Sequence, residues 1–173
     1  MNIILEIVWF LLPAYFANMA PVFANAIFHN KGKPINVALF GSHKTYRGFL
    51  AGIIAAVLII YIQLYLYGIS FFRSTSILDY SQINLLIYGL LFGFGSMLGD
   101  LIKSFFKRRL GFKPGSRFMP FDQIDYILGT FLLLSQLFFP GWIFFAIAII
   151  LTFLLNVIVN WIGFYLKLRE DKW

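Results

Sequence analysis

Long apolar segments are the feature of this sequence that most limits its possible folds. Apolar runs of about 20 residues, the length that a helix needs to cross a bilayer, recur along the chain. Hydrophobic residues make up 61% of the 173 residues and charged residues only 12%, which excludes a soluble domain of this size. We therefore predict an all-α integral membrane protein.

The apolar segments predict five transmembrane helices in a single bundle, because no linker or change of composition divides the chain. Residues 1–173 then form one transmembrane domain with polar loops at about 29–48 and 103–122. The first segment has no basic leader region, so we expect it to be retained as a span. The spans are expected at residues 1–28, 48–68, 84–106, 123–139 and from Pro140-Gly141 to about 166. Four glycines are expected to thin one side of the third span, where a helix or ligand can approach: Gly89, Gly93, Gly95 and Gly99.

Basic residues are distributed unevenly between the two ends of these spans. Thirteen of the fourteen Lys and Arg residues lie in the two polar loops and the C-terminal tail, and only Arg73 lies between the second and third spans. The positive-inside rule then predicts a cell-membrane protein with its N-terminus outside and both basic loops and the C-terminus in the cytoplasm. Because the basic residues flank apolar spans, the net charge of +7 indicates anionic membrane partners and no nucleic acid.

Charged residues are concentrated between residues 99 and 125. If the third helix continues past the membrane edge, one of its faces carries Asp100, Lys103, Ser104, Lys107 and Arg108. A carboxylate at the membrane end of such a face indicates a functional site. A basic helix end, which favours the helix dipole and anionic headgroups, is the alternative explanation for Lys103 and Arg109.

Asp122 and Asp125 lie one turn apart at the predicted start of the fourth helix, after Pro120. A helix cap would explain Asp122, whereas Asp125 lies too deep to act as one. Together with Asp100 on a neighbouring helix, these carboxylates can bind Mg²⁺, which prefers a few carboxylates completed by water and phosphate oxygens. Basic side chains beside such an ion typically hold a nucleoside triphosphate. We predict that Asp100, Asp122 and Asp125 bind the metal ion, and that these three aspartates and Lys107 are the catalytic residues.

The first polar loop offers a second cationic patch. Lys44 and Arg47 lie between Gly41 and Gly48, and a pair of cations at such a loop can clamp phosphates. A plain positive-inside loop is the alternative. The chain has no Cys and only His29 and His43, which argues against thiolate chemistry, a histidine metal site or a histidine dyad.

The charged motifs together resemble the signature of CTP-dependent phosphatidate cytidylyltransferases. The matching positions are Gly99, Asp100, Ser104, Lys107, Arg108, Lys113, Pro120, Asp122 and Asp125. The sequence departs from that signature in three ways: Pro114 replaces an Asp, Gln123 replaces an Arg, and a His-Gly-Gly segment is missing.

The short chain, the HKTYRG loop and the shortened acidic motif look more like the archaeal branch of these enzymes, the CDP-archaeol synthases. The resemblance implies transfer of CMP from CTP to the phosphate of 2,3-bis-O-geranylgeranylglycerol 1-phosphate, with Mg²⁺ as cofactor and release of pyrophosphate. It implies phospholipid biosynthesis at the cytoplasmic face of the membrane. The residues expected to bind CTP and phosphates are Lys44, Arg47, Ser104, Lys107, Arg108 and Lys113.

Two other functions are consistent with the same residues. One is a CDP-diacylglycerol synthase acting on phosphatidate, because the many Phe residues suit fatty acyl and isoprenoid chains equally. The other is a protein without enzymatic activity that transports or binds anions or lipids. The spans carry few charges apart from Glu6, which argues against a transport pathway. Small-residue faces suit bundle packing or an oligomer contact, so the oligomeric state stays open.

Overall fold

The computed structural model describes residues 2–28, 32–112 and 116–165 of the chain. Its ordered elements are helices, and the β pairing in these ranges consists of a single bridge between Pro34 and Thr45. The helices are α1 (Ile3–Ile27), α2 (Val37–Phe40), α3 (Tyr46–Leu66), α4 (Ser70–Thr75), α5 (Leu85–Arg109), α6 (Phe121–Leu134) and α7 (Trp142–Tyr165).

Four of these helices are long and apolar enough to cross a membrane: α1, α3, α5 and residues 142–162 of α7. The prediction of an all-helical membrane protein is thus confirmed, with four candidate spans. The predicted fourth span, residues 123–139, differs from the structure, because α6 has only 14 residues. A helix of that length rises roughly 21 Å, less than the ~30 Å hydrocarbon layer. The helix α5 continues to Arg109, so the polar loop that follows it is shorter than the predicted 103–122.

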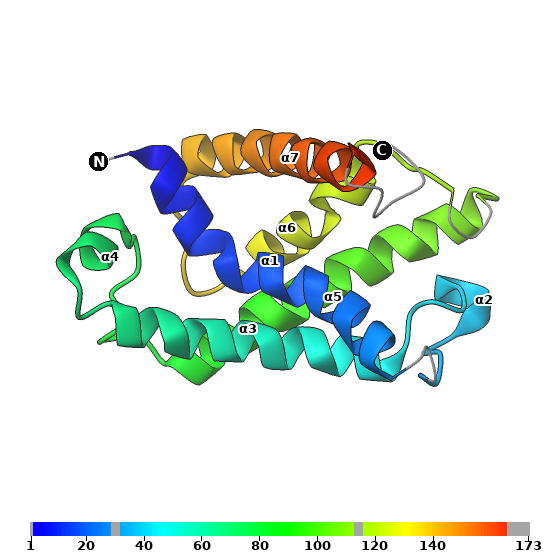
Figure 1. The fold of residues 1–173 in the computed structure, drawn as a ribbon, viewed down its shortest axis with the longest axis horizontal. Helices are drawn as coiled ribbons and strands as arrows, with labels where there is room; N and C mark the ends of the chain where they lie inside the picture. The colour runs from blue at the N-terminus through cyan, green and yellow to red at the C-terminus, as the bar shows by residue number, and fades with distance from the viewer. Residues whose placement is uncertain (1, 29–31, 113–115, 166–173) are drawn as a thin grey trace.

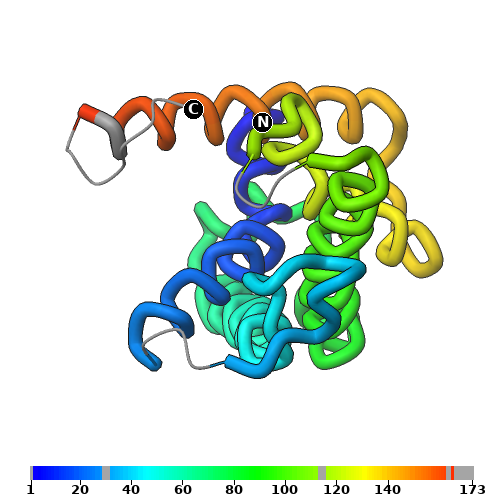
Figure 2. Tube along the Cα trace, turned by 90° about the vertical axis from the view of Figure 1, so that its right-hand side faces the viewer, coloured from blue at the N-terminus to red at the C-terminus, as the bar shows by residue number. Residues whose placement is uncertain are grey.

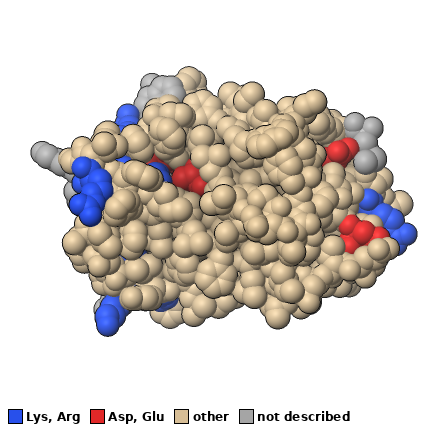
Figure 3. All heavy atoms as spheres, turned by 180° about the vertical axis from the view of Figure 1, so that it is seen from behind, with Lys and Arg blue, Asp and Glu red and all other residues tan. Residues whose placement is uncertain are grey.

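The helices form a bundle with two distinct ends. Helices α3 and α7 lie on opposite sides, with α1 and α6 between them, in both views (Figures 1 and 2). The start of α1 and the short helix α4 lie at one end, and α2 and the last turns of α5 and α7 lie at the other (Figure 1). Figure 3 shows that the charged side chains on the rear face gather at these two ends. The apolar middle is what a membrane-embedded surface requires.

The core of the bundle is built around α1, which packs against α3, α5, α6 and α7. Phe10 is 1% exposed, and its ring lies 5.3–6.0 Å, centroid to centroid, from the rings of Phe92, Phe131, Phe138 and Phe144. Such edge-to-face and tilted contacts stabilise a pair by about 0.5–1.5 kcal/mol beyond area burial. One aromatic side chain therefore joins α1 to the three helices α5, α6 and α7.

Polar side chains next to the first turn cap three of the long helices. The side chains of Asn2, Thr45 and Asn84 accept hydrogen bonds from backbone amides in the first turns of α1, α3 and α5. Each cap satisfies an amide that has no partner within the helix, typically a gain of about 1 kcal/mol. These caps fix where α1, α3 and α5 begin.

Glycines bring α5 into close contact with two neighbours, whereas the sequence predicted one thinned side. A Cβ on Gly93 would lie 2.7 Å from the Cα of Ile53 on α3. A Cβ on Gly95 would lie 2.7 Å from the carbonyl oxygen of Gly129 on α6. Backbones approach this closely only where side chains are absent. The α5–α6 contact sets the distance between Asp100 and the two aspartates of α6.

We predict that the substitution Gly129→Ala destabilises the protein, by about 1–3 kcal/mol as is typical for overpacking. The new Cβ would lie 2.8 Å from the Cα of Gly99 and would overlap the carbonyl oxygen of Gly95. Thermal unfolding of the detergent-purified protein measures the effect. Gly68→Ala is the matched control, because its Cβ would meet nothing closer than 3.8 Å. Equal midpoints for the two variants would contradict the tight α5–α6 contact.

Candidate active site

Three carboxylates from two helices surround one ammonium group. Asp100 comes from α5, and Asp122 and Asp125 come from the first turns of α6. The Lys103 Nζ lies 3.1 Å from Asp100 Oδ1, 3.3 Å from Asp122 Oδ1 and 2.8 Å from Asp125 Oδ2. The three aspartates singled out in the sequence thus share one neighbour, and that neighbour is a lysine.

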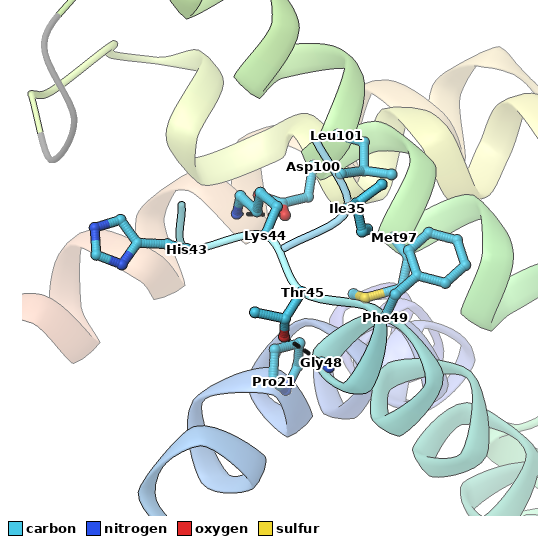
Figure 4. Close-up of a pocket in the computed structure, with 10 residues that line it drawn as sticks. All are labelled: Pro21, Ile35, His43, Lys44, Thr45, Gly48, Phe49, Met97, Asp100 and Leu101. Atoms are coloured by element: carbon cyan, nitrogen blue, oxygen red, sulfur yellow. Dashed lines mark hydrogen bonds and ion pairs between the residues drawn. The ribbon is translucent and has the colours of Figure 1, made fainter. Parts of the chain in front are cut away.

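A bridged loop carries Lys44 to this cluster. Between α1 and α3 the chain folds back on itself, with Ile35 N donating to Lys44 O at 2.8 Å and Tyr46 N donating to Lys33 O at 3.1 Å. The Lys44 side chain then reaches α5, where its Nζ lies 2.5 Å from Asp100 Oδ2. Figure 4 shows the Lys44 and Asp100 side chains meeting above the start of α3. The predicted phosphate-binding Lys44 therefore lies beside a predicted metal ligand.

Lys107 connects Ser116, which precedes α6, to the cluster. Its Nζ donates to the carbonyl oxygen of Ser116 and to both carboxylate oxygens of Asp122, at 3.1 and 3.2 Å. The amide of Phe118 donates to Asp122 Oδ2 at 2.6 Å. Asp122 thus accepts a hydrogen bond from a backbone amide that precedes α6, and it also belongs to the charged cluster; it does not cap the first turn of α6, although the sequence had suggested such a cap.

The cluster is largely withdrawn from solvent and balanced in charge. The Asp125, Asp100 and Asp122 side chains are 5%, 17% and 24% exposed. Three aspartates face three lysines, which is the pairing that buried charges need. Asp100 lies nine residues before the end of α5, which corresponds to roughly 14 Å along the helix.

Two cavities adjoin the cluster. The larger, of about 530 Å³, lies along α5 and α6, and Lys103 and Asp125 are the charged members of its described lining. Its remaining lining is apolar, including Phe106 and Leu132. The smaller, of about 50 Å³, lies beside Lys44 and Asp100 (Figure 4). An apolar cavity that ends on buried charges suits a ligand with a hydrocarbon part and an anionic head.

Three other predicted phosphate-binding residues follow on α5 and beyond it. The Ser104 hydroxyl donates to the carbonyl oxygen of Asp100 at 2.8 Å, so it supports the helix turn that carries this aspartate. Arg108 is half-buried and follows Lys107 directly. Lys113 lies outside the described residues.

Arg47 takes a different position from its neighbour in sequence, Lys44. Its guanidinium donates to Asn25 Oδ1 at 3.3 Å and lies 4.9 Å from the ring centroid of Phe28. Both partners belong to the end of α1, so these contacts of Arg47 join the first turn of α3 to α1. Asn25, which is half-buried, thereby makes an interhelical hydrogen bond between α1 and α3.

Sequence reasoning gave no specific role to Lys103, which the structure places at the centre of the cluster. A signal for it was present, because Lys103 lies one turn after Asp100 and one turn before Lys107. The contact with α6 could not be read from that spacing, since it depends on how closely the two helices pack.

The donor atoms of the cluster suit Mg²⁺, a hard cation that prefers carboxylate oxygens. Three carboxylates lie within 3.3 Å of the Lys103 Nζ, and the buried Asp125 Oδ2 has this ammonium as its ion-pair partner. In the described part of the chain, no three His, Asp or Glu side chains are arranged to hold a metal ion as they stand. The oxygen ligands therefore suit the ion in type, and the Lys103 ammonium occupies the space between them.

The opposite end of the bundle carries exposed charges of a different kind. The Asp79 carboxylate accepts hydrogen bonds from the amide and hydroxyl of Ser81, and these lower the pKa of Asp79 below its usual range. Arg73 lies over the ring of Tyr67, 5.1 Å from its centroid. These side chains are exposed turn and helix-end residues, so Asp79 is a suitable control position for the buried aspartates.

The fold and the cluster define a class: a helical membrane protein with a buried cluster of aspartates and lysines next to an apolar cavity. A family model described as CarS-like, CDP-archaeol synthase, matches residues 1–173, and the chain belongs to this family.

Relatives and a solved structure agree with this assignment. The chain is 34% identical to a CDP-archaeol synthase of Archaeoglobus fulgidus, with 100% of the chain and 99% of the relative covered. It is 33% identical to a CDP-archaeol synthase of Methanoculleus marisnigri, with 94% and 100% covered. A solved structure described as an intramembrane enzyme for archaeal membrane lipid biosynthesis matches with a TM-score of 0.67 and 27% identity, over 91% of this chain and 94% of that one.

We predict that Lys107→Met lowers the free energy of unfolding by about 1–3 kcal/mol, because it leaves Asp122 and the Ser116 carbonyl without this donor. Thermal unfolding and limited proteolysis of the α5–α6 loop measure the loss. Arg109→Met is the control on the same helix, since Arg109 is exposed and lies over Phe105, a contact that typically contributes about 0.5–1 kcal/mol. A larger loss for the Arg109 variant would contradict this role of Lys107.

Proposed function

We propose that this chain is a CTP-dependent cytidylyltransferase that transfers CMP to the phosphate of 2,3-bis-O-geranylgeranylglycerol 1-phosphate, giving CDP-archaeol and pyrophosphate. The names of its relatives support this activity. The observation that carries it is the meeting of a buried charge cluster with an apolar cavity, at Lys103 and Asp125. A substrate with isoprenoid chains and a phosphate matches both parts.

In this proposal the two substrates approach the cluster from different sides. The lipid chains occupy the apolar cavity along α5 and α6, so that the lipid phosphate lies at its charged part. The triphosphate of CTP lies on the side of Lys44 and Lys107, whose ammonium groups already face Asp100 and Asp122. The remaining predicted contacts of CTP and the phosphates are Arg47, Ser104, Arg108 and Lys113.

The metal site of the proposal consists of Asp100, Asp122 and Asp125. Magnesium held there would neutralise charge on the phosphate oxygens of the nucleotide. The lysines of this chain would supply the rest of the positive charge, as point charges that need no fixed geometry.

The proposed reaction needs no general base from the protein. An oxygen of the lipid phosphate, ionised at neutral pH, forms a bond to the α-phosphorus of CTP. The bond between the α-phosphorus and the bridging oxygen to the β-phosphorus breaks, and its electron pair leaves with pyrophosphate. One phosphoanhydride bond forms and one breaks. The chain contributes positioning and charge stabilisation, which suits a site built from aspartates and lysines.

The alternatives receive less support. The relatives are named CDP-archaeol synthases, which favours an isoprenoid ether lipid over phosphatidate. A transporter would need charged residues along a path through the bundle, and the charges of the rear face lie at its two ends (Figure 3).

We also propose five membrane crossings, with the N-terminus outside and the cluster facing the cytoplasm. In this arrangement α6 and the residues that follow it make the fourth crossing together. Supporting this, α1 begins at one end of the bundle and α7 ends at the other (Figure 1). The basic residues at the second end obey the positive-inside rule if that end is cytoplasmic.

We predict that Asp125→Asn lowers CMP transfer at least about a hundredfold, the usual effect of losing one charge-stabilising group. Formation of labelled CDP-lipid from CTP and the isoprenoid ether lipid phosphate measures it, and phosphatidate and the other three nucleoside triphosphates test selectivity. Asp79→Asn, at the opposite end, should retain wild-type activity. Near-normal turnover by folded D125N would remove Asp125 from the site, and no transfer by the wild-type protein would refute the proposed activity.

The proposed orientation can be tested by labelling, because the chain contains no Cys and each introduced thiol is unique. Ser42 and Gln82 are exposed and lie in loops on either side of α3. In right-side-out vesicles, a membrane-impermeant maleimide should label Gln82→Cys and should label Ser42→Cys only after lysis. The reverse pattern would invert the proposed topology.

A further inference from the structure

We infer that Lys103 is a resident counter-ion that takes the place of the divalent cation in the resting protein, and that it must leave the carboxylates before the cation binds. This inference rests on the proposed function only in taking Asp100, Asp122 and Asp125 as the metal ligands. It concerns a residue of this chain, and its outcome can be measured without catalysis.

The position of the Lys103 ammonium is central. It lies within 3.3 Å of an oxygen of each carboxylate, whereas Lys44 contacts Asp100 and Lys107 contacts Asp122. A cation coordinated by all three carboxylates would occupy this same space. Lys103 and the divalent cation therefore compete sterically as well as electrostatically.

Charge balance makes the competition strong. With Lys44, Lys103 and Lys107 in place, the three carboxylates are neutralised, and a divalent cation would add an uncompensated charge to a poorly solvated site. If the Lys103 ammonium withdraws, the three carboxylates together with Lys44 and Lys107 carry a net charge of −1. The carboxylate oxygens then have free lone pairs. The free protein should therefore bind a divalent cation weakly.

The structure provides a place for the displaced side chain. Lys103 lines the 530 Å³ cavity along α5 and α6 as well as contacting the carboxylates. Its stem has four methylene groups, so the ammonium can turn into that cavity without movement of α5. There it would need a new anionic partner, and a bound substrate phosphate supplies one.

A consequence is that the metal ion and phosphate-bearing substrates should bind cooperatively. Each phosphate that takes the Lys103 ammonium releases the carboxylates, and each divalent cation that takes the carboxylates releases Lys103. Linkage requires that the two effects be equal in free energy. A lysine that is only a fixed structural ion pair would not produce this coupling.

The experiment measures binding of Mn²⁺ alone to detergent-purified protein, by electron paramagnetic resonance of the free ion, with no nucleotide or lipid phosphate present. We expect Lys103→Met to bind Mn²⁺ at least about tenfold more tightly than wild type, a change of about 1.4 kcal/mol. Lys44→Met is the matched control. It also removes one positive charge from Asp100 but leaves the centre occupied, so its gain should be below about threefold.

Each result has a defined meaning. Wild-type protein that binds Mn²⁺ as tightly as K103M, or K44M that matches K103M, would overturn the inference. If K103M can be purified only with Mn²⁺, its unfolding on chelation supports the inference, because the ion then replaces the missing counter-charge. Lys103→Gln, with a shorter neutral side chain, should repeat the gain. Since wild-type CMP transfer tests the proposed function separately, either idea can fail without the other.

Discussion

The close contact between α5 and α6 is the constraint on which the rest of the site depends. Gly95 and Gly99 on α5 face Gly129 on α6 with almost no space between the backbones. Only at this separation can one lysine of α5 reach carboxylates of both helices. The apolar cavity is lined mostly by residues of the same two helices, so their contact also places the cluster of aspartates and lysines beside that cavity. Packing of glycines within the bundle therefore determines the electrostatics of the site.

Much of this structure could be predicted from local patterns in the sequence. Apolar length located α1, α3, α5 and α7 to within a few residues, because each must present hydrocarbon for about 20 residues. The spacing of Asp122 and Asp125 placed both near the start of a helix, as observed. Lys44 was singled out in the sequence as a phosphate-binding loop residue, and the structure places it beside Asp100, with which it forms an ion pair.

Features that depend on packing between helices could not be read from the sequence. Helix α6 ends at Leu134, five residues before the apolar run does, and hydropathy does not distinguish a helix from an apolar loop. Arg47 and Lys44 lie in one short basic segment, yet one contacts α1 and the other α5. Lys103 had the right spacing along α5, but its place among three carboxylates is a property of two helices together.

The depth of Asp100 along α5 has a consequence for the fate of a reactive nucleotide. In the proposed function, a phosphoanhydride held at this largely buried cluster would lie about 14 Å along α5 from the end of the helix and would meet few solvent molecules. Hydrolysis, the wasteful side reaction of every activated nucleotide, would then be suppressed by burial and not by a moving lid. A protein of this size would keep its chemistry selective by the depth of its site within the helix bundle.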